Sequence, residues 1–173
     1  MAILDIVTFP DKFLKRPTNP VENIDGALQE MIHNMGDTMY QAPGVGLAAI
    51  QVGLDQSMLI YDITPAEEGR SLNVLINPRI IESEGEILSE NEGCLSVPEY
   101  RSDVKRFASI LVEAYDQNEK PLRFEAHEFL SIVLQHEIDH LNGKLFIDRI
   151  SPLKRQLYAR RVQKQLKRNN KET

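Results

Sequence analysis

Residues 135–143 read Gln-His-Glu-Ile-Asp-His-Leu-Asn-Gly, and this stretch decides how the rest of the chain is interpreted. His136 and His140 are four residues apart, so on a helix both imidazoles leave the same face. Two neutral imidazoles at this spacing suit a divalent transition metal, and Glu137 between them can act as a general base. The alternative is a solvated helix face with two ordinary histidines. The apolar residues nearby favour instead a buried helix over about residues 127–142.

The same helix predicts the wall of a pocket. Phe129, Ile132 and Val133 lie on the stripe that carries both histidines, whereas Leu134, Ile138 and Leu141 form a second stripe. If the histidines face a cavity, the first stripe lines an apolar pocket beside the metal that fits an aliphatic side chain. The alternative, that both stripes belong to the core, stays open at this point.

A metal needs a third protein ligand, and no histidine follows His140. His33 and His127 lie in unrelated contexts; we expect His127 to be exposed and His33 to be a surface residue or one whose hydrogen bonds are satisfied locally. The lone Cys94 is the better candidate, because a glycine precedes it in Glu-Gly-Cys-Leu-Ser-Val-Pro, residues 92–98. A single cysteine is most often an inert buried side chain. A set of two histidines and one cysteine would nevertheless leave a fourth position open for catalysis.

A third segment, residues 44–51, reads Gly-Val-Gly-Leu-Ala-Ala-Ile-Gln. It is a poor nucleotide-binding loop, because it lacks the G-x-G-x-x-G pattern and no lysine follows it. Its small residues instead permit the close approach of another backbone. Gln51 at its end could direct an amide N–H at a developing oxyanion.

The remaining elements predict an α+β fold, in which antiparallel sheets pack around the metal-binding helix and a C-terminal helix follows. Helical spacing of apolar residues indicates a helix over about residues 24–40. We expect Asn77-Pro78 to end a strand and Glu84-Gly85 to form the turn of a hairpin. Ser151-Pro152 is typical of a helix start. The expected strands cover residues 57–63, 72–76, 79–82, 86–88, 108–115 and 121–125.

Length and composition favour one domain in a reducing compartment. The chain has 173 residues, 42% of them hydrophobic, and one cysteine, which excludes an internal disulfide framework. We expect no signal peptide, since the first residues lack a basic stretch, and no membrane span. Residues 151–173 carry eight Lys or Arg and one acid, a net +7, which leaves −13 on residues 1–150. We therefore expect a catalytic part, 1–150, and a basic helical tail, 151–173, of the same domain.

In order and spacing, residues 44–51, 92–96 and 135–143 resemble the three motifs of peptide deformylases, and the resemblance spans nearly the whole chain. It implies a cytoplasmic metal-dependent enzyme that hydrolyses the N-formyl group from the initiator methionine of nascent polypeptides and releases formate. Cys94, His136 and His140 would hold the metal, which in this family is Fe²⁺ and which Zn²⁺, Ni²⁺ or Co²⁺ can replace. Glu137 would take a proton from the attacking water and deliver it to the leaving amine.

The resemblance also implies how substrate is held. Gln51 and the backbone N–H of Leu95 would stabilise the oxyanion. The wall formed by Phe129, Ile132 and Val133 falls where the family receives the methionine side chain. The remaining substrate contacts that the resemblance implies are the backbone pairing near Val45, Gly46 and Gly93 and the guanidinium of Arg101.

The basic tail is similar to that of deformylases from Gram-negative bacteria, which implies docking on ribosomal RNA near the tunnel exit. A solvated helix kept for solubility is the plain alternative. Two other functions compete with deformylation. An H-E-x-x-H endopeptidase lacks its expected third ligand here, and a ribosome-binding module without catalysis would have no need for Glu137, Gln51 and three metal ligands.

Overall fold

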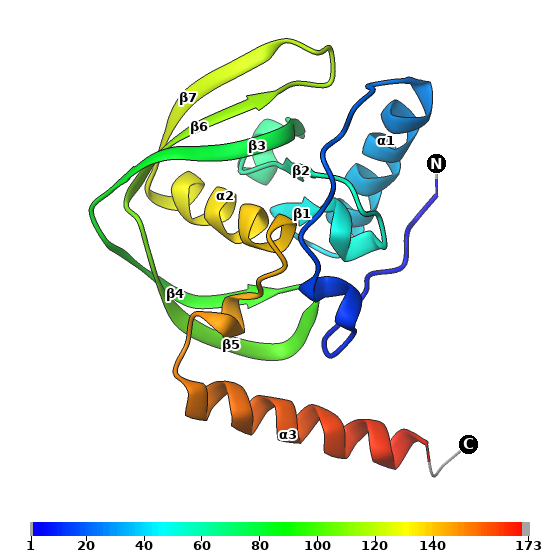
Figure 1. Ribbon diagram of the computed structural model, residues 1–173, viewed down its shortest axis with the longest axis vertical. Helices are drawn as coiled ribbons and strands as arrows, with labels where there is room; N and C mark the ends of the chain where they lie inside the picture. Colours follow the sequence, from blue (N-terminus) through cyan, green and yellow to red (C-terminus); the bar gives the residue numbers. More distant parts are fainter. Residues whose placement is uncertain (1, 171–173) are drawn as a thin grey trace.

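The computed structural model describes residues 2–170, and a single helix lies at its centre. This helix, α2 (Glu128–Leu141), lies between a five-stranded antiparallel sheet and a two-stranded one (Figure 1). The larger sheet has the order β1 (Gly46–Ala48), β2 (Met58–Tyr61), β3 (Asn73–Glu84), β6 (Ser109–Tyr115) and β7 (Pro121–His127). The smaller one pairs β4 (Ile87–Cys94) with β5 (Val97–Arg106). The predicted α+β fold with sheets around the metal-binding helix is confirmed.

Two further helices complete the fold. The first, α1 (Gly26–Gln41), begins at Asp25, whose side chain accepts from the backbone of Leu28, and it packs beside β1 and β2. The second, α3 (Pro152–Asn169), follows the N-cap Ser151 as expected and lies below the smaller sheet (Figure 1). Short 3₁₀ turns cover Lys12–Lys15, Ala49–Val52, Ala66–Glu68 and Phe146–Asp148. No helix in residues 2–170 is long and apolar enough to cross a membrane.

One face of α2 anchors it in the main core. Leu134, Ile138 and Leu141 are buried against apolar side chains of the larger sheet, such as Leu59 and Val112. These three residues are the second stripe of the sequence pattern, and its period places them on one side of the helix. The opposite side of α2 is thereby turned toward the smaller sheet, where β4 ends at Cys94.

The expected strand end at Asn77-Pro78 is wrong, because β3 continues to Glu84. A register shift against β6 between Ile76 and Arg79 accommodates the proline, which cannot donate to the ladder. Asn77 adopts a positive φ of 52°, and its side chain bonds both the N–H and the C=O of Val21. A long-range contact therefore stabilises a conformation that local preference disfavours.

The hairpin expected at Glu84-Gly85 is also wrong. The strand before it pairs with β6 and the strand after it pairs with β5, so Gly85 marks the passage from one sheet to the other. Its φ of 68° suits glycine, and a Cβ there would lie 3.1 Å from the Cβ of Ala108. The strand β5 is absent from the sequence-based expectation, because Val104 is the single apolar residue among its alternating buried positions Ser102, Val104 and Arg106.

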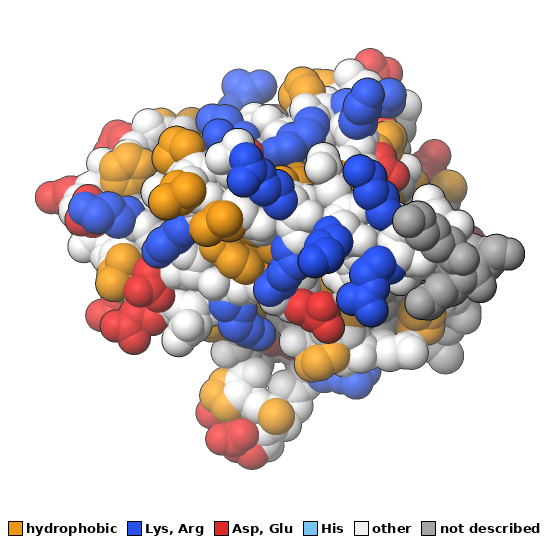
Figure 2. All heavy atoms as spheres, turned by 90° about the horizontal axis from the view of Figure 1, so that it is seen from below, with side chains coloured by type: hydrophobic (Ala, Val, Ile, Leu, Met, Phe, Trp, Pro, Cys, Tyr) orange, Lys and Arg blue, Asp and Glu red, His pale blue; other side chains and the backbone are white. Residues whose placement is uncertain are grey.

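The helix α3 contacts the body through its first turn, where Arg155 pairs with Asp148, and through its middle. Tyr158 is buried beside Tyr100 and Phe9, and Val162 packs against the same cluster. Arg161 donates to the backbone oxygen of Glu99. The other side chains of the helix face outward, and Figure 2 shows lysines and arginines spread over this face with apolar side chains among them. The tail residues Lys171 and Glu172 lie outside the described residues.

Candidate metal centre

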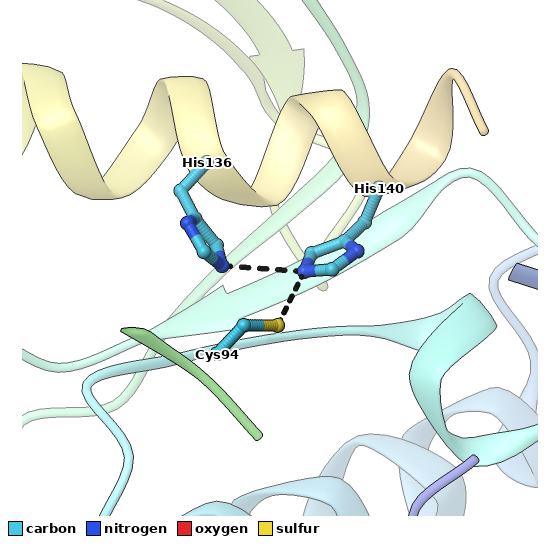
Figure 3. Close-up of side chains that lie close together, drawn as sticks. All are labelled: Cys94, His136 and His140. Carbon is cyan, nitrogen blue, oxygen red and sulfur yellow. Dashed lines mark hydrogen bonds between the residues drawn. The ribbon is translucent and has the colours of Figure 1, made fainter. Parts of the chain in front are cut away.

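Cys94, His136 and His140 converge on one point between α2 and the end of β4 (Figure 3). The Cys94 Sγ lies 3.2 Å from the His140 Nε2, which lies 3.3 Å from the His136 Nε2. All three ligand atoms are within 4.8 Å of one another. The helix supplies both imidazoles from consecutive turns, and the smaller sheet supplies the thiol.

This cluster fits a divalent transition metal. Two imidazole nitrogens and a sulfur that face one another across so short a gap satisfy each other poorly, whereas a cation between them would bind all three lone pairs. The Nδ1 of His140 is buried and has no hydrogen-bond partner, so no hydrogen bond at Nδ1 fixes the tautomer of this imidazole. Soft sulfur together with imidazole excludes Mg²⁺ and Ca²⁺, which prefer oxygen ligands.

A buried carboxylate orients one of the imidazoles. The Nδ1 of His136 lies 2.6 Å from the Oε1 of Glu92, which leaves Nε2 free for a metal. Arg106 in turn donates its Nε to Glu92 over 3.2 Å. Burial raises the pKa of Glu92, but hydrogen bonds from His136 and Arg106 outweigh it and lower the pKa to about 2. Glu92 is therefore a carboxylate at neutral pH.

Glu137 lies in the same cavity without a salt-bridge partner. It is buried, and its Oε2 has no hydrogen-bond partner. Burial raises the pKa of Glu137 to about 7, which suits a group that accepts and returns a proton near neutrality. Gly46 makes room for it, since a Cβ at Gly46 would lie 2.5 Å from the Glu137 Oε1.

The amide of Gln51 is held so that its NH₂ group points into the site. Its Oε1 accepts from the backbone N–H of Ala48 over 2.9 Å. Its Nε2 lies 3.1 Å from the Ser96 Oγ and 3.6 Å from the Cys94 Sγ. The first contact assigns the orientation of the amide, because only the oxygen can accept from Ala48. Two polarised N–H groups are thereby placed beside the metal ligand.

One pocket of about 720 Å³ collects nearly all of the residues singled out in the sequence. Ile132 and Phe129 form its wall, with Phe129 at the exposed rim. Val133 also touches the main core, so both interpretations of this stripe apply to it. His140 is fully buried beneath the pocket. The other predicted residues that line it are Val45, Gly46, Gln51, Gly93, Cys94, Leu95, Arg101, His136 and Glu137.

Arg101 lies across the smaller sheet from Gly93, with which it is paired in register. Its guanidinium donates to the backbone oxygen of Asn91 over 3.1 Å. A Cβ at Gly93 would lie 3.2 Å from the Arg101 Cζ, so the missing side chain lets the guanidinium lie against the strand. The other two histidines are remote, and His33 and His127 are exposed as expected.

Sequence reasoning missed the supporting residues Glu92, Ser96 and Arg106. Metal-binding histidines usually donate their second nitrogen to a carboxylate, so an acid two residues before Cys94 was a candidate. Ser96 belongs to the same segment and carried no separate indication. Nothing near Arg106 in the sequence pointed to the site, because its partner in α2 is 33 residues away.

Comparisons of the chain with a family profile, with curated sequences and with solved structures all indicate the same family. The profile described as "Polypeptide deformylase" matches residues 3–156. The peptide deformylase of Desulfosudis oleivorans is 52% identical over 173 residues, all of both chains. A crystal structure of a peptide deformylase from Legionella pneumophila superposes with a TM-score of 0.88 at 44% identity, covering 99% of each chain.

A crystal structure described as the class I type b peptide deformylase from Acinetobacter baumannii bound to Met-Ala-Ser has a TM-score of 0.80 at 31% identity. It covers 86% of this chain and 99% of that one. The profile match, the full-length identity and the shared fold place the chain in one family: it belongs to the polypeptide deformylases.

Proposed function

We propose that this protein hydrolyses the formamide bond of N-formylmethionyl nascent peptides and releases formate in a metal-dependent reaction. The observation that carries the proposal is the convergence of Cys94, His136 and His140 beside a buried Glu137, whose Oε2 has no hydrogen-bond partner, in a peptide-sized pocket. Membership of the deformylase family supports the same reaction. A metal at these three ligands would polarise the formyl oxygen and acidify water.

The substrate backbone fits between two strand edges. The β1 strand pairs only with β2, and the β4 strand pairs only with β5, so each has an unpaired edge among the described strands. Val45 and Gly46 on one side and Gly93 on the other line the pocket. An extended peptide added to these edges would gain main-chain hydrogen bonds. Arg101 at the rim would contact residues further along the peptide.

The methionine side chain would enter the apolar part of the pocket against Phe129, Ile132 and Val133. An unbranched thioether adapts to such a wall, and burial of its carbon atoms supplies binding free energy of about 25 cal/mol per Å². This contact places the formyl carbon beside the ligands. The solved relative that holds Met-Ala-Ser is consistent with this mode of binding.

Each polar group near the reacting carbon has one task. Glu137 accepts a proton from the attacking water and returns it to the leaving amine, for which a pKa near neutrality is well suited. The Gln51 NH₂ and the backbone N–H of Leu95 donate to the oxygen that becomes negative. Glu92 keeps His136 oriented throughout. The chain's own residues thus hold substrate, move one proton and neutralise one developing charge.

We further propose Fe²⁺ as the metal, with Zn²⁺, Ni²⁺ or Co²⁺ as substitutes. A site of one thiolate and two imidazoles accepts all four ions, so the donor set alone does not choose among them. Analysis of protein purified without oxygen tests the proposal directly. Iron at about one equivalent supports it, and zinc with full activity under the same conditions contradicts it.

The reaction itself has a discriminating test. We expect formate from formyl-Met-Ala-Ser and no release of acetate from acetyl-Met-Ala-Ser, which differs by one methyl group where the attack occurs. An H-E-x-x-H endopeptidase would instead cut an internal peptide bond and produce a new amino terminus. Internal cleavage without formate would overturn the proposal, and binding without turnover would favour a non-catalytic module.

The basic tail, residues 151–173, is proposed to dock on ribosomal RNA near the tunnel exit, in the cytoplasm, while residues 1–150 carry the catalysis. The support is the outward-facing lysines and arginines of α3 (Figure 2). Removing residues from Arg160 onward also deletes Arg161, which contacts Glu99. The double variant Lys164→Glu/Lys167→Glu is therefore the sharper test.

We expect this variant to lose co-sedimentation with ribosomes at low salt, because phosphate contacts are strongly salt-dependent. Deformylation of tripeptides should be unchanged, since the proposed catalytic residues precede position 141. Retained sedimentation would contradict the docking proposal, and the solubility role of the helix would then explain its charge.

A further inference from the structure

Arg149 is a charged residue outside the pocket that nevertheless connects to the metal ligands. It follows the 3₁₀ turn Phe146–Asp148 and precedes Ser151, where α3 begins. Its Nε and Nη2 donate to the two oxygens of Asp139, each over 2.5 Å. Asp139 lies in α2 directly before the ligand His140. The pair is a forked, charge-assisted contact of the kind that fixes geometry.

From Asp139 a buried chain of charges leads to the other imidazole. The Oδ2 of Asp139 also accepts from the Nη1 of Arg106 over 2.7 Å. Arg106 forks onto both oxygens of Glu92, and Glu92 holds the Nδ1 of His136. The side chains of Arg106, Glu92 and Asp139 are 1%, 6% and 9% exposed, whereas that of Arg149 is 40% exposed. Arg149 is thus the end of the chain that reaches solvent.

Charge alternates along this chain, and Arg149 balances it. Two carboxylates, Glu92 and Asp139, face two guanidinium groups, Arg106 and Arg149. Without Arg149, one buried guanidinium would serve two buried carboxylates, and Asp139 would lose two hydrogen bonds. A buried carboxylate left short of partners is costly. Arg106 would then shift toward Asp139 and release part of its hold on Glu92.

The turn before Arg149 contacts the same imidazole from another direction. The ring of Phe146 stacks on that of His136, with centroids 6.2 Å apart and an interplanar angle of 23°. The segment between α2 and α3 therefore reaches His136 twice, once through an aromatic stack and once through the chain of charges. Both contacts restrict how the ring can turn.

We propose that Arg149 is a positioning residue for the metal site, which keeps Arg106 on Glu92 and thereby keeps the Nε2 of His136 directed at the metal. The inference rests on the proposed metal function. The plain alternative is that Arg149 only fastens the start of α3 to the body. Partners of this kind around a metal typically change metal affinity by about 10–100-fold when they are removed.

The test compares Arg149→Gln with the wild type and with Arg155→Gln as a matched control. Arg155 is a nearby, similarly exposed arginine that pairs with Asp148 and forms no ion pair with Asp139 or Glu92 among the described residues. Metal release to a chelator is measured well below the unfolding temperature, together with the visible absorption of the Co²⁺-substituted protein. We expect Arg149→Gln to release metal about tenfold faster or more and to shift the absorption bands. Arg155→Gln should do neither.

The variant Glu92→Gln tests whether Arg149 influences metal release through Glu92. This substitution keeps the shape of the side chain and removes its charge. If Arg149 acts through Glu92, the double variant should release metal little faster than Glu92→Gln alone. Arg149→Lys keeps the charge without the fork, so partial recovery is expected, and it serves as the test should Arg149→Gln not fold. A wild-type release rate and spectrum in both Arg149 variants, or additive effects with Glu92→Gln, would overturn the inference. A wild-type protein that binds no metal would instead overturn the proposed function.

Discussion

At the scale of single residues, Glu137 occupies a position proposed to be catalytic, where burial disfavours its charged form. Burial raises its pKa from 4.5 to about 7 in the metal-free protein. The folded chain therefore holds the proton more tightly than the unfolded chain does. The contribution of Glu137 to stability is fully present below the unfolded pKa and is lost as the pH rises through about 7. This cost in stability falls on the residue that is proposed to move a proton.

Glu137→Gln is expected to stabilise the metal-free protein while it abolishes most turnover. The gain in unfolding free energy should be small at pH 5 and approach ~3 kcal/mol at pH 8, because between these pH values the unfolded chain releases the proton of Glu137 while the folded chain keeps it up to about pH 7. Turnover of the metal-loaded variant should fall by roughly 10² or more. Thermal unfolding at both pH values and formate release provide the measurements. Equal stabilisation at pH 5 and pH 8 would contradict the burial argument.

Gly46→Ala tests the room that Glu137 needs. The added Cβ would lie 2.5 Å from the Glu137 Oε1, so either the carboxylate or β1 must move. We expect kcat/KM to fall by about tenfold or more, since misplacement by about 1 Å can cost 10²-fold. Metal content should be unchanged. Gly26→Ala is the control, because no atom lies within 4 Å of a Cβ at that position. Equal activity of both variants would remove Gly46 from this role.

The sequence reveals those site residues that lie close together along the chain, and it does not reveal those that contact the site from distant segments. His136, Glu137 and His140 share one helix, so their spacing alone brought them together. Cys94 was chosen as the remaining candidate, and the structure places its sulfur among the ligands. Supporting side chains such as Glu92 and Arg106 lie in the smaller sheet and contact residues of α2. No repeating pattern in the sequence connects these positions with α2. They emerge only from the tertiary structure.

At the scale of elements, α2 has one side for the core and one for the pocket, and Val133 belongs to both. A bulky residue at Val133 would disturb the core, so Ile132 is the better position for a test. Ile132→Trp should fill the apolar wall and lower kcat/KM for formyl-Met peptides strongly, with metal content and unfolding temperature near those of the wild type.

A substitution on the core side of α2 provides the control for the pocket-side variant. Leu134→Ala should cost about 2–5 kcal/mol of stability, because Leu134 is fully buried. Its activity per folded, metal-loaded molecule should stay near normal. If Ile132→Trp left kcat/KM unchanged for formyl-Met, formyl-Leu and formyl-Ala peptides, this stripe would not receive the substrate side chain.

The strands were harder to predict than the helices. The starts of α1 and α3 follow from the capping residues Asp25 and Ser151, which act locally, and α2 follows from its apolar period. Pro78 in β3 suggested the end of a strand, and Gly85 before β4 suggested the turn of a hairpin. Their meaning depends on which strand pairs with which, and Asn77 is held by Val21 from 56 residues away.

At the scale of the whole molecule, two sheets bring strand edges, metal ligands and an apolar wall to a single pocket. One helix supplies both imidazoles, the proposed base Glu137 and part of that wall, while the end of β4 supplies the thiol. The basic helix lies below the smaller sheet (Figure 1), and none of its residues lines the pocket. The proposed catalysis and the proposed docking therefore use different residues, so each can be tested without the other.

The central claim is that Cys94, His136 and His140 hold one divalent metal on which deformylation depends. Titrating metal-free protein with Fe²⁺ without oxygen, while formate release from formyl-Met-Ala-Ser is followed, tests it most directly. We predict that activity rises linearly to one equivalent and then stays constant, and that Cys94→Ala neither retains metal nor gains activity. Activity without metal, or full metal content and turnover in Cys94→Ala, would contradict the account.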